Sequence, residues 1–460
     1  MIPLTLADVA QAVGGRLTGA DPATVVTGPV EYDSRRVEPG GLFVAFPGEQ
    51  VDGHDYAAGA YAAGAVAVLG TRAVDAVPMV VVHDALTAMA ALARAVTARL
   101  PDLTIVGLTG SSGKTTTKDM VAQLLTGLGP TIAPAGSLNN ELGYPYTVLK
   151  STTDTRYLVL ELGARGIGHI RDLCEVACPR IGIVLNVGVA HIGEFGSQDR
   201  IALAKGELVE ALPADGLAVL NADDPRVAAM AARTGARVVL VGEAASASVR
   251  AAEVRLDERG RASYTLVTPE GTAPVTLAVS GRHQVGNTLA AAAVARELGM
   301  SLSTLADALG RLRLVSTRRM DVFDRADGVT VIDDSYNANP ASTAAALRAL
   351  TAMARGRRAI AVLGYLAELG GYERTGHEEV GRLAAELGVD LLIAVGTTAA
   401  PILDGAAAVA SWEGKSVQVT EQEEAVALLR EQLRPGDVVL VKGSRYRTWA
   451  VADSLREPLG

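Results

Sequence analysis

Hydrophobic and polar positions follow one another in a regular order along most of the chain. Near the N-terminus, the short apolar runs 65–69 and 79–82 lie between polar turns and predict buried strands. Further on, the apolar runs 104–108, 157–162 and 181–187 alternate with segments of helical spacing. Strands that alternate with helices are typical of a parallel sheet covered by helices. This part of the pattern therefore predicts an α/β architecture.

The pattern changes between residues 237 and 280, where apolar and polar residues alternate one by one. A period of two predicts antiparallel strands, which we place at the edge of the central sheet. Residues 314–460 return to alternating strands and helices. We therefore predict an α/β protein of three domains. They are a small α/β domain over residues 1–98, a central P-loop-type, mostly parallel sheet with an antiparallel edge meander over 99–313, and a Rossmann-like doubly wound domain over 314–460.

Composition agrees with this architecture and narrows the class of protein. The 460 residues are enough for about three domains, and the 49% hydrophobic content suits an α/β enzyme with large cores. A net charge of −9 argues against a nucleic-acid-binding surface. The two cysteines, Cys174 and Cys178, have no partners at zinc-finger spacing. No secretory leader and no membrane-length apolar run is found, so we expect a cytoplasmic protein without membrane insertion. We also expect it to be a monomer, although no pattern in the sequence bears on its oligomeric state.

The segment 109–117, TGSSGKTTT, is the strongest chemical motif. It lies between a predicted strand and a predicted helix, which is the context of a phosphate-binding loop. Lys114 would bring a cation to the outer phosphates, and a threonine hydroxyl after it can bind Mg²⁺. Position 108 is leucine rather than the glycine of the commonest NTPase pattern, so the loop is a shorter variant. A glycine turn with a surface lysine is the alternative. The loop residues expected to contact a nucleotide are Gly110, Ser111, Ser112, Gly113, Lys114, Thr115 and Thr116.

Three polar residues then follow as candidates for the site, and two of them lie at strand ends, where an open α/β sheet places its ligands. Glu161 ends a strand, where a magnesium–nucleotide site commonly has a carboxylate, although a helix cap or an ion pair is an equal alternative. His191 comes just after the next strand, although a lone histidine is usually not a ligand. Lys205 lies on an otherwise apolar helical turn, so it either reaches solvent or has altered chemistry.

Taken in order along the chain, these motifs resemble the Mur ligases of peptidoglycan synthesis. The resemblance rests on the short phosphate loop, Glu161, His191, the AKGE segment at 204–207 and the DDSYNANP segment at 333–340. Shorter matches occur at residues 33–35, 52–55, 137–140, 186–191 and 441–445. Each match alone is weak, but the ordered set is specific and extends through the whole chain.

The resemblance implies an ATP-dependent amide synthase. A carboxylate would attack the γ-phosphate of ATP to give an acyl phosphate and ADP, and an amine would then displace phosphate. The best fit within the family is the branch that joins D-alanyl-D-alanine to UDP-N-acetylmuramoyl-tripeptide. The small-molecule substrates would thus be a UDP-sugar peptide or another acid, and a dipeptide or another amine.

The resemblance also assigns roles to residues. The catalytic residues would be Lys114, Lys205, His191 and Arg319. Two Mg²⁺ ions are implied, with metal-site residues Thr115, Glu161, His191 and Lys205, the lysine carrying a carbamate derived from CO₂. Further ATP contacts would come from Asn287, Arg319, Asp334, Tyr336 and Asn337. The other substrates would contact Ser34, Arg35, His54, Asn139, Asn140, Lys442 and Ser444.

Several positions depart from the usual family pattern. Tyr365 replaces a carboxylate, Arg318 replaces a common glycine, and Arg165 replaces an asparagine or serine. Bulky residues also occur at 446–449, and at Tyr144 and Tyr146. These changes fit either ordinary drift or a paralogue that joins a different acid and amine in a specialised pathway.

Two further functions remain as alternatives. A ligase similar to folylpolyglutamate synthase would share the loop, but that family starts near its phosphate loop. A nucleotide-gated binding protein would need fewer metal-site groups. For the ligase, we expect residues 312–316 to act as a hinge that lets the third domain close on the second.

Overall fold

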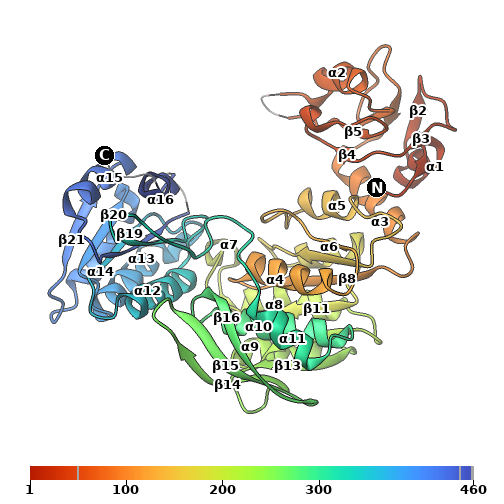
Figure 1. The fold of residues 1–460 in the computed structure, drawn as a ribbon. Coiled ribbons are helices and arrows are strands. Elements are labelled where there is room, and N and C mark those ends of the chain that lie inside the picture. The colour runs from red at the N-terminus through yellow and green to blue at the C-terminus, as the bar shows by residue number, and fades with distance from the viewer. Residues whose placement is uncertain (49–50, 445–446, 457–460) are drawn as a thin grey trace.

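The computed structural model describes residues 1–48, 51–444 and 447–456. Three lobes follow one another along the chain, with the N-terminal lobe at the upper right of Figure 1, the central lobe below it and the C-terminal lobe on the left. The predicted α/β architecture is confirmed, because each lobe contains its own sheet with helices packed on it. Both predicted domain limits fall between elements, and they remain predictions. Within the described residues, no helix is both long and apolar enough to cross a bilayer.

The N-terminal lobe contains a five-stranded sheet in the order β2-β7-β6-β5-β4. Its first helix follows from local sequence, because Thr5 caps it in a capping box and Gly14 ends it at a φ of 62°. The strands are β1 (Leu4–Thr5), β2 (Arg16–Thr18), β3 (Val25–Val26), β4 (Val30–Glu31), β5 (Leu42–Val44), β6 (Ala67–Gly70) and β7 (Met79–Val81). The helices are α1 (Leu6–Val13), η1 (Ser34–Arg36), η2 (Gly53–Tyr56), α2 (Ala57–Ala62) and α3 (Ala85–Thr97).

The central lobe is built on a nine-stranded sheet in the order β16-β15-β14-β13-β12-β11-β8-β10-β9. The strands are β8 (Thr104–Thr109), β9 (Thr131–Ile132), β10 (Tyr157–Glu161), β11 (Ile181–Val184), β12 (Leu217–Asn221), β13 (Arg237–Gly242), β14 (Val249–Leu256), β15 (Arg261–Thr268) and β16 (Gly271–Ser280). The helices are α4 (Lys114–Thr126), α5 (Gly143–Val148), α6 (His169–Val176), α7 (Ile192–Phe195), α8 (Gln198–Glu210), α9 (Pro225–Ala228), η3 (Ala229–Arg233), α10 (Gln284–Glu297) and α11 (Leu302–Gly310).

The predicted edge meander is confirmed with one difference. Strands β14, β15 and β16 are antiparallel, but β13, the first strand of the alternating segment, is parallel to both of its neighbours. The reason is that α9 and η3 carry the chain back across the sheet after β12 and so extend the strand–helix alternation by one strand.

The C-terminal lobe has a six-stranded sheet in the order β17-β18-β22-β19-β20-β21, parallel except for the pair β17–β18. This is the predicted doubly wound unit. Its strands are β17 (Asp321–Asp324), β18 (Thr330–Asp333), β19 (Ala359–Leu363), β20 (Leu391–Val395), β21 (Lys415–Val419) and β22 (Val438–Lys442). Its helices are α12 (Pro340–Ala354), η4 (Gly370–Tyr372), α13 (Glu373–Glu386), η5 (Thr397–Ala399), α14 (Pro401–Ala407), α15 (Gln422–Gln432) and α16 (Trp449–Arg456).

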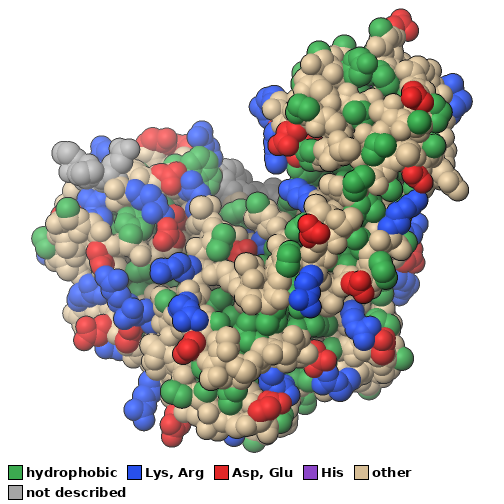
Figure 2. All heavy atoms as spheres, turned by 45° about the vertical axis from the view of Figure 1, so that its right-hand side comes forward, with side chains coloured by type: hydrophobic (Ala, Val, Ile, Leu, Met, Phe, Trp, Pro, Cys, Tyr) green, Lys and Arg blue, Asp and Glu red, His purple; other side chains and the backbone are tan. Residues whose placement is uncertain are grey.

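The first two lobes share one apolar core. A continuous cluster of buried side chains extends from Leu6 and Leu42 through Tyr146 to Leu208. The other face of the central sheet packs a second cluster, which contains Val106 from β8. The C-terminal lobe has separate clusters on the two faces of its own sheet. Figure 2 shows basic and acidic side chains interspersed over the face in view.

Candidate active site

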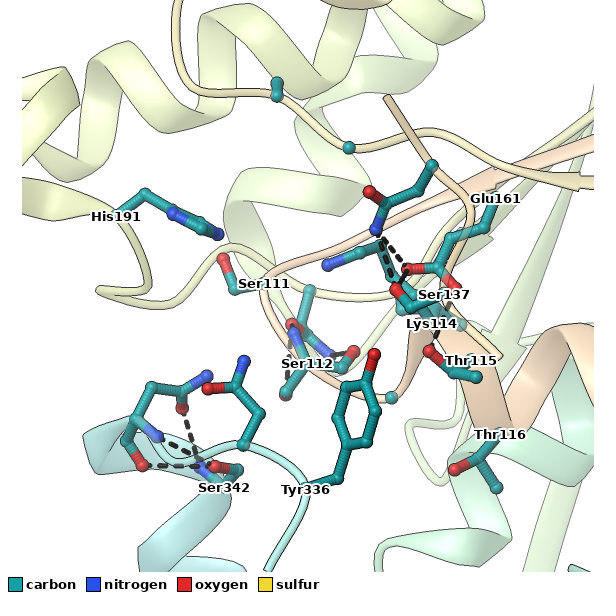
Figure 3. A pocket seen from close by; sticks show the side chains of 18 of the residues that line it. Ser111, Ser112, Lys114, Thr115, Thr116, Ser137, Glu161, His191, Tyr336 and Ser342 are labelled. Carbon is teal, nitrogen blue, oxygen red and sulfur yellow. Dashed lines mark hydrogen bonds between the residues drawn. The ribbon is translucent and has the colours of Figure 1, made fainter. Parts of the chain in front are cut away.

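A cleft of about 1030 Å³ opens where strands β8, β10 and β11 end. Because the carboxyl ends of parallel strands meet at one edge of a sheet, this is where an open α/β fold binds ligands. Most of its lining comes from the central lobe, and the C-terminal lobe closes the opposite side. From the N-terminal lobe, Tyr32 reaches the cleft. Figure 3 shows part of the lining from close by.

The phosphate loop lies between β8 and α4. Gly113 has a φ of 82°, and a Cβ there would lie 2.8 Å from Oδ1 of Asn287, so glycine is needed on both grounds. Helix α4 begins directly after it at Lys114, which points the first backbone N–H groups of the helix into the cleft. The Lys114 ammonium donates to the Gly110 carbonyl at 2.9 Å. Burial lowers the pKa of Lys114, and nearby Glu161 opposes that shift.

The Glu161 carboxylate is buried and held by three donors. It accepts hydrogen bonds from Thr115 Oγ1 at 2.9 Å, Ser137 Oγ at 3.0 Å and Asn139 Nδ2 at 2.7 Å, as Figure 3 shows in part. The sequence left a helix cap and an ion pair as alternative roles for Glu161. Among the described residues, Glu161 caps no helix and forms no ion pair with a lysine or arginine. A fixed carboxylate beside a threonine hydroxyl is an oxygen donor set that suits Mg²⁺. Ser137 was missed as a site residue, although it lies in the polar loop that contains Asn139.

His191 lies across the phosphate loop from Glu161 (Figure 3). Its backbone has a φ of 61°, and it precedes the short helix α7. Its Nδ1 atom lies 2.6 Å from Oε2 of Glu368 and 4.0 Å from Oε2 of Glu194. Burial lowers the pKa of His191, while Glu368 raises it and Lys114 lowers it. Sequence reasoning missed Glu368, because its contact with His191 forms only where the C-terminal lobe meets the central one.

Lys205 is buried on α8, with only 4% of its surface exposed. Within the described residues, no hydrogen-bond partner is found for its ammonium group. Burial holds the pKa of Lys205 well below its ordinary value, Lys114 lowers it further, and Glu161 opposes both effects. Burial and the Lys114 charge therefore both favour the neutral amine over the ammonium form. The sequence left two alternatives for Lys205, a side chain that reaches solvent or one with altered chemistry. The burial of the residue argues against the first.

The C-terminal lobe brings Arg319 directly onto the phosphate loop. Its Nη2 atom donates to Thr115 Oγ1 at 3.2 Å, and its guanidinium lies 4.2 Å from the centre of the Tyr336 ring. Buried Lys442 supports the same wall by contacting Asp334 Oδ2 at 2.5 Å and donating to the Asn337 carbonyl at 2.9 Å. The C-terminal lobe therefore contacts the phosphate loop of the central lobe in this structure.

The cleft unites most of the predicted site residues. Those that line it are Ser111, Ser112, Gly113, Lys114, Thr115, Thr116, Asn139, Asn140, Glu161, His191, Lys205, Asn287, Arg319, Asp334, Tyr336, Asn337, Lys442 and Ser444. Asn287 lies in the first turn of α10, which begins at Gln284.

Three predicted substrate residues in the N-terminal lobe do not line the cleft. His54 is 2% exposed, with Nδ1 2.6 Å from Asp52 Oδ1 and Nε2 accepting from the Thr71 N–H at 2.9 Å. Its imidazole thus holds a turn in place. Arg35 is exposed and forms a bidentate pair with Asp33, and Ser34 begins the short helix η1 beside it.

Three departures from the family pattern, at Arg318, Trp449 and Tyr365, have packing explanations. Arg318 has a φ of 60°, the left-handed region that favours glycine, which explains why glycine is common there. Its guanidinium pairs with Asp453 at 3.0 Å and lies 4.6 Å from the Trp449 ring, so the two departures occur together. Tyr365 does not line the cleft. It donates to Glu373 at 2.5 Å and stacks on His377.

The remaining departures divide between packing and the cleft. Tyr144 donates to the Ala177 carbonyl at 2.7 Å, within the central lobe. Tyr146 instead reaches the N-terminal lobe, where its hydroxyl lies 2.9 Å from both oxygens of Glu31. Arg165 does line the cleft. Tyr446 and Arg445 lie outside the described residues.

Comparison with known proteins gives matches along nearly the whole chain. Residues 29–103 match the family described as Mur ligase family, catalytic domain. Residues 108–295 match the Mur ligase middle domain, and residues 318–445 match the Mur ligase, glutamate ligase domain.

Individual relatives cover the same length. A UDP-N-acetylmuramoyl-tripeptide–D-alanyl-D-alanine ligase of Mycobacterium bovis is 49% identical, covering 99% of this chain and 98% of that protein. The Escherichia coli enzyme of the same name is 36% identical, covering 97% and 96%. Among solved structures, MurF from Acinetobacter baumannii superposes with a TM-score of 0.89 at 33% identity, covering 99% of both chains. The MurF ligase from Thermotoga maritima in complex with ADP gives 0.81 at 29%, covering 94% and 97%.

Proposed function

Because the chain belongs to the Mur ligase family, we propose that it joins D-alanyl-D-alanine to UDP-N-acetylmuramoyl-tripeptide in peptidoglycan synthesis. It is an ATP-dependent ligase that forms an amide bond. These substrates are the ones in the names of the full-length relatives described above, which are 49% and 36% identical to this chain. ATP and UDP-linked precursors are cytoplasmic metabolites, so we place the reaction there, with the protein acting as a monomer.

The first step transfers a phosphoryl group. A carboxylate oxygen of the tripeptide attacks the γ-phosphorus of ATP, the bond to the β,γ-bridging oxygen breaks, and an acyl phosphate and ADP result. Lys114 and the first turn of α4 neutralise the phosphates from the central lobe. Arg319, held beside Thr115 at 3.2 Å, supplies a second cation from the C-terminal lobe.

The second step forms the amide. The amine nitrogen of the dipeptide attacks the acyl carbon, the carbon–oxygen bond to phosphate breaks, and the nitrogen loses a proton. This step needs orientation and exclusion of water, because water would hydrolyse the acyl phosphate. Asp334, Tyr336 and Lys442 line the cleft on the side where we place the amine, and they would help to orient it.

Mg²⁺ would screen the negative charge of the triphosphate and help align it. Thr115 and Glu161 fit one ion, because both offer oxygen atoms and three hydrogen bonds fix the carboxylate. His191, across the phosphate loop, would help hold a second ion. We also propose that Lys205 reacts with CO₂ to form a carbamate. Its buried, deprotonation-prone amine and the absence of a hydrogen-bond partner among the described residues support this modification.

The observation that carries the proposal is the convergence of Lys114, Glu161 and Arg319 on one cleft from two lobes. The decisive experiment incubates the purified protein with ATP, Mg²⁺, UDP-N-acetylmuramoyl-tripeptide and D-alanyl-D-alanine and follows phosphate release. Release should require both the acid and the amine. Release with neither, or with the acid alone at the full rate, would contradict a ligase.

Arg165 favours one second candidate, a paralogue that joins a different acid. Its guanidinium lines the cleft at a position where the family commonly has an asparagine or serine. An additional cation there would favour an acid with an extra carboxylate. The same assay with a series of acids separates the candidates, because a paralogue should prefer another acid over the UDP-linked tripeptide.

A further inference from the structure

Two adjacent charged residues on α4, Lys118 and Asp119, are buried and have no role in the mechanism above. Lys118 is 0% exposed, and Asp119 is 9% exposed. A lysine is almost never fully buried unless its charge is paired. Here the ammonium contacts Oδ1 of Asp119 at 2.8 Å and donates to the carbonyls of Pro134 at 2.5 Å and Gly136 at 2.9 Å. The ammonium is thus paired with one carboxylate and hydrogen-bonded to two backbone carbonyls.

The backbone that Lys118 holds belongs to the loop that supports Glu161. The second of its two carbonyl contacts, at Gly136, directly precedes Ser137. Ser137 and Asn139 then both donate to Oε1 of Glu161, at 3.0 and 2.7 Å. We call residues 134–140 the carboxylate-supporting loop. Lys118 fixes the start of this loop, and so it acts on the Glu161 carboxylate without touching it.

The other oxygen of Asp119 holds the linker between the central and C-terminal lobes. Its Oδ2 atom accepts from the Ser316 N–H at 3.2 Å and the Ser316 hydroxyl at 2.6 Å. One helical turn further, Gln123 pairs with both backbone groups of Arg313, accepting from N–H at 3.0 Å and donating to C=O at 2.9 Å. Residues four apart lie on one face of a helix, so α4 binds the linker at two points.

We propose that Lys118 and Asp119 are positioning residues that couple the interlobe linker to the carboxylate-supporting loop. The Asp119 carboxylate uses one oxygen for the linker and the other for Lys118. If Ser316 withdraws, that carboxylate is free to turn both oxygens to the ammonium, and Lys118 then holds the two loop carbonyls less firmly. Such competition is strong inside a protein, where water does not screen it. The value of this coupling for catalysis rests on the proposed function.

Hydrogen–deuterium exchange of the ligand-free protein tests the coupling without catalysis. Ser316→Ala removes a hydroxyl from the linker, and it should raise the exchange rate of amides 135–140. A lost hydrogen bond corresponds to about a two- to tenfold increase. Asp119→Asn should do the same. Thr317→Ala is the matched control, because Thr317 is an exposed linker residue next to Ser316 and its hydroxyl makes no hydrogen bond within the described residues. It should leave the loop unchanged.

A second readout measures equilibrium binding of a fluorescent ATP analogue against Mg²⁺ concentration. Ser316→Ala should shift the Mg²⁺ midpoint in proportion to its effect on exchange, whereas a purely stabilising role would lower the melting temperature and leave the midpoint unchanged. If Lys118→Met frees the loop but Ser316→Ala and Asp119→Asn do not, the coupling is refuted. If Lys118→Met fails to fold, the other two variants still decide. A chain that shows the coupling but no ligase activity would refute only the proposed function.

Discussion

Nδ1 of His191 lies 2.6 Å from Oε2 of Glu368, and this contact joins the central lobe to the C-terminal lobe at the rim of the cleft. The backbones approach closely beside it, since a Cβ on Gly193 would lie 2.5 Å from the backbone nitrogen of Gly370. The pair is about 30% exposed, with side-chain values of 29% and 28%. A pair this accessible contributes about 1 kcal/mol or less. It can therefore bias closure without locking it.

Glu368→Ala should shift the ligand-free protein toward an open arrangement. Losing about 1 kcal/mol of interlobe contact changes the closure equilibrium about fivefold. Small-angle scattering should show a larger radius of gyration for the variant than for the wild type without nucleotide. With nucleotide bound, the two proteins should differ less. Glu378→Ala is the control, because Glu378 pairs with Arg374 inside the C-terminal lobe. Identical scattering from both variants would contradict a closing role for Glu368.

Lys114→Ala should lower kcat by about 10²- to 10³-fold, because it removes a cation from the phosphates where charge is transferred. Steady-state phosphate release measures the change. Lys415→Ala, an exposed lysine on β21 outside the cleft lining, should leave the rate unchanged. Near-normal activity of the Lys114 variant would refute the assignment of the phosphate loop as the catalytic nucleotide site.

Lys205 should bind CO₂ reversibly. Protein incubated with ¹³C-bicarbonate should give a carbamate carbon signal by NMR, and Lys205→Arg should lack that signal because arginine stays protonated. The variant should lose about 10- to 100-fold in activity if the carbamate positions the metal. Removing CO₂ from the buffer should slow the wild type, and bicarbonate should restore it. A wild-type rate independent of bicarbonate, with no carbon signal, would refute the carbamate.

Tyr146→Phe should loosen the N-terminal lobe. It leaves the buried Glu31 carboxylate without its tyrosine hydroxyl, at a cost of about 1–3 kcal/mol in unfolding free energy. We expect a raised KM for the acid substrate and an unchanged KM for ATP. Tyr144→Phe is a matched control, because that hydroxyl bonds within the central lobe and its loss should lower stability without affecting either KM. Equal kinetic effects would contradict the interlobe role of Tyr146.

His377 should make the C-terminal lobe sensitive to acid. Its Nε2 accepts from the Leu366 N–H at 3.0 Å, and its Nδ1 donates to the Glu373 carbonyl at 2.7 Å, so the neutral ring is the bonded form. Burial lowers the pKa of His377, partly opposed by Glu373. The unfolded chain therefore binds a proton more readily than the folded chain, and stability falls as pH drops below the unfolded value of about 6.5.

The loss from this one histidine cannot exceed about 1.4 kcal/mol per pH unit. Denaturant unfolding between pH 7 and pH 5 measures it. His377→Gln should flatten the dependence, leaving the contributions of His191 and His283, whose pKa values burial also lowers. His83→Gln, at an exposed position, should keep the wild-type slope. An unchanged slope in the His377 variant would show that this ring protonates equally well in both states.

Local pattern was enough to predict the phosphate loop and Glu161. Both depend on a strand, a turn and a helix that are contiguous in sequence, so spacing alone locates their side chains at the edge of the sheet. The same reasoning placed the antiparallel meander but not the direction of β13. Whether a strand is parallel or antiparallel to its neighbour depends on the connection that precedes it. The sequence of the strand itself does not carry that information.

Contacts between distant segments could not be predicted. Glu368 meets His191, and Ser316 meets Asp119, only because the C-terminal lobe packs back onto the central one. His54 illustrates a different difficulty. A polar turn looks the same whether its histidine faces a ligand or, as here, its own lobe. In the sequence, the unusual residues Arg318 and Trp449 are far apart and give no sign of being related. In the structure, the Arg318 guanidinium lies over the Trp449 ring.

The apolar cluster shared by the first two lobes has a consequence for how the molecule comes apart. Side chains from both lobes lose their packing together, whereas the sheet of the C-terminal lobe keeps its own two layers of buried residues. Heating should therefore melt the chain in two cooperative blocks rather than three, with a calorimetric trace that divides near the linker and not at the N-terminal boundary.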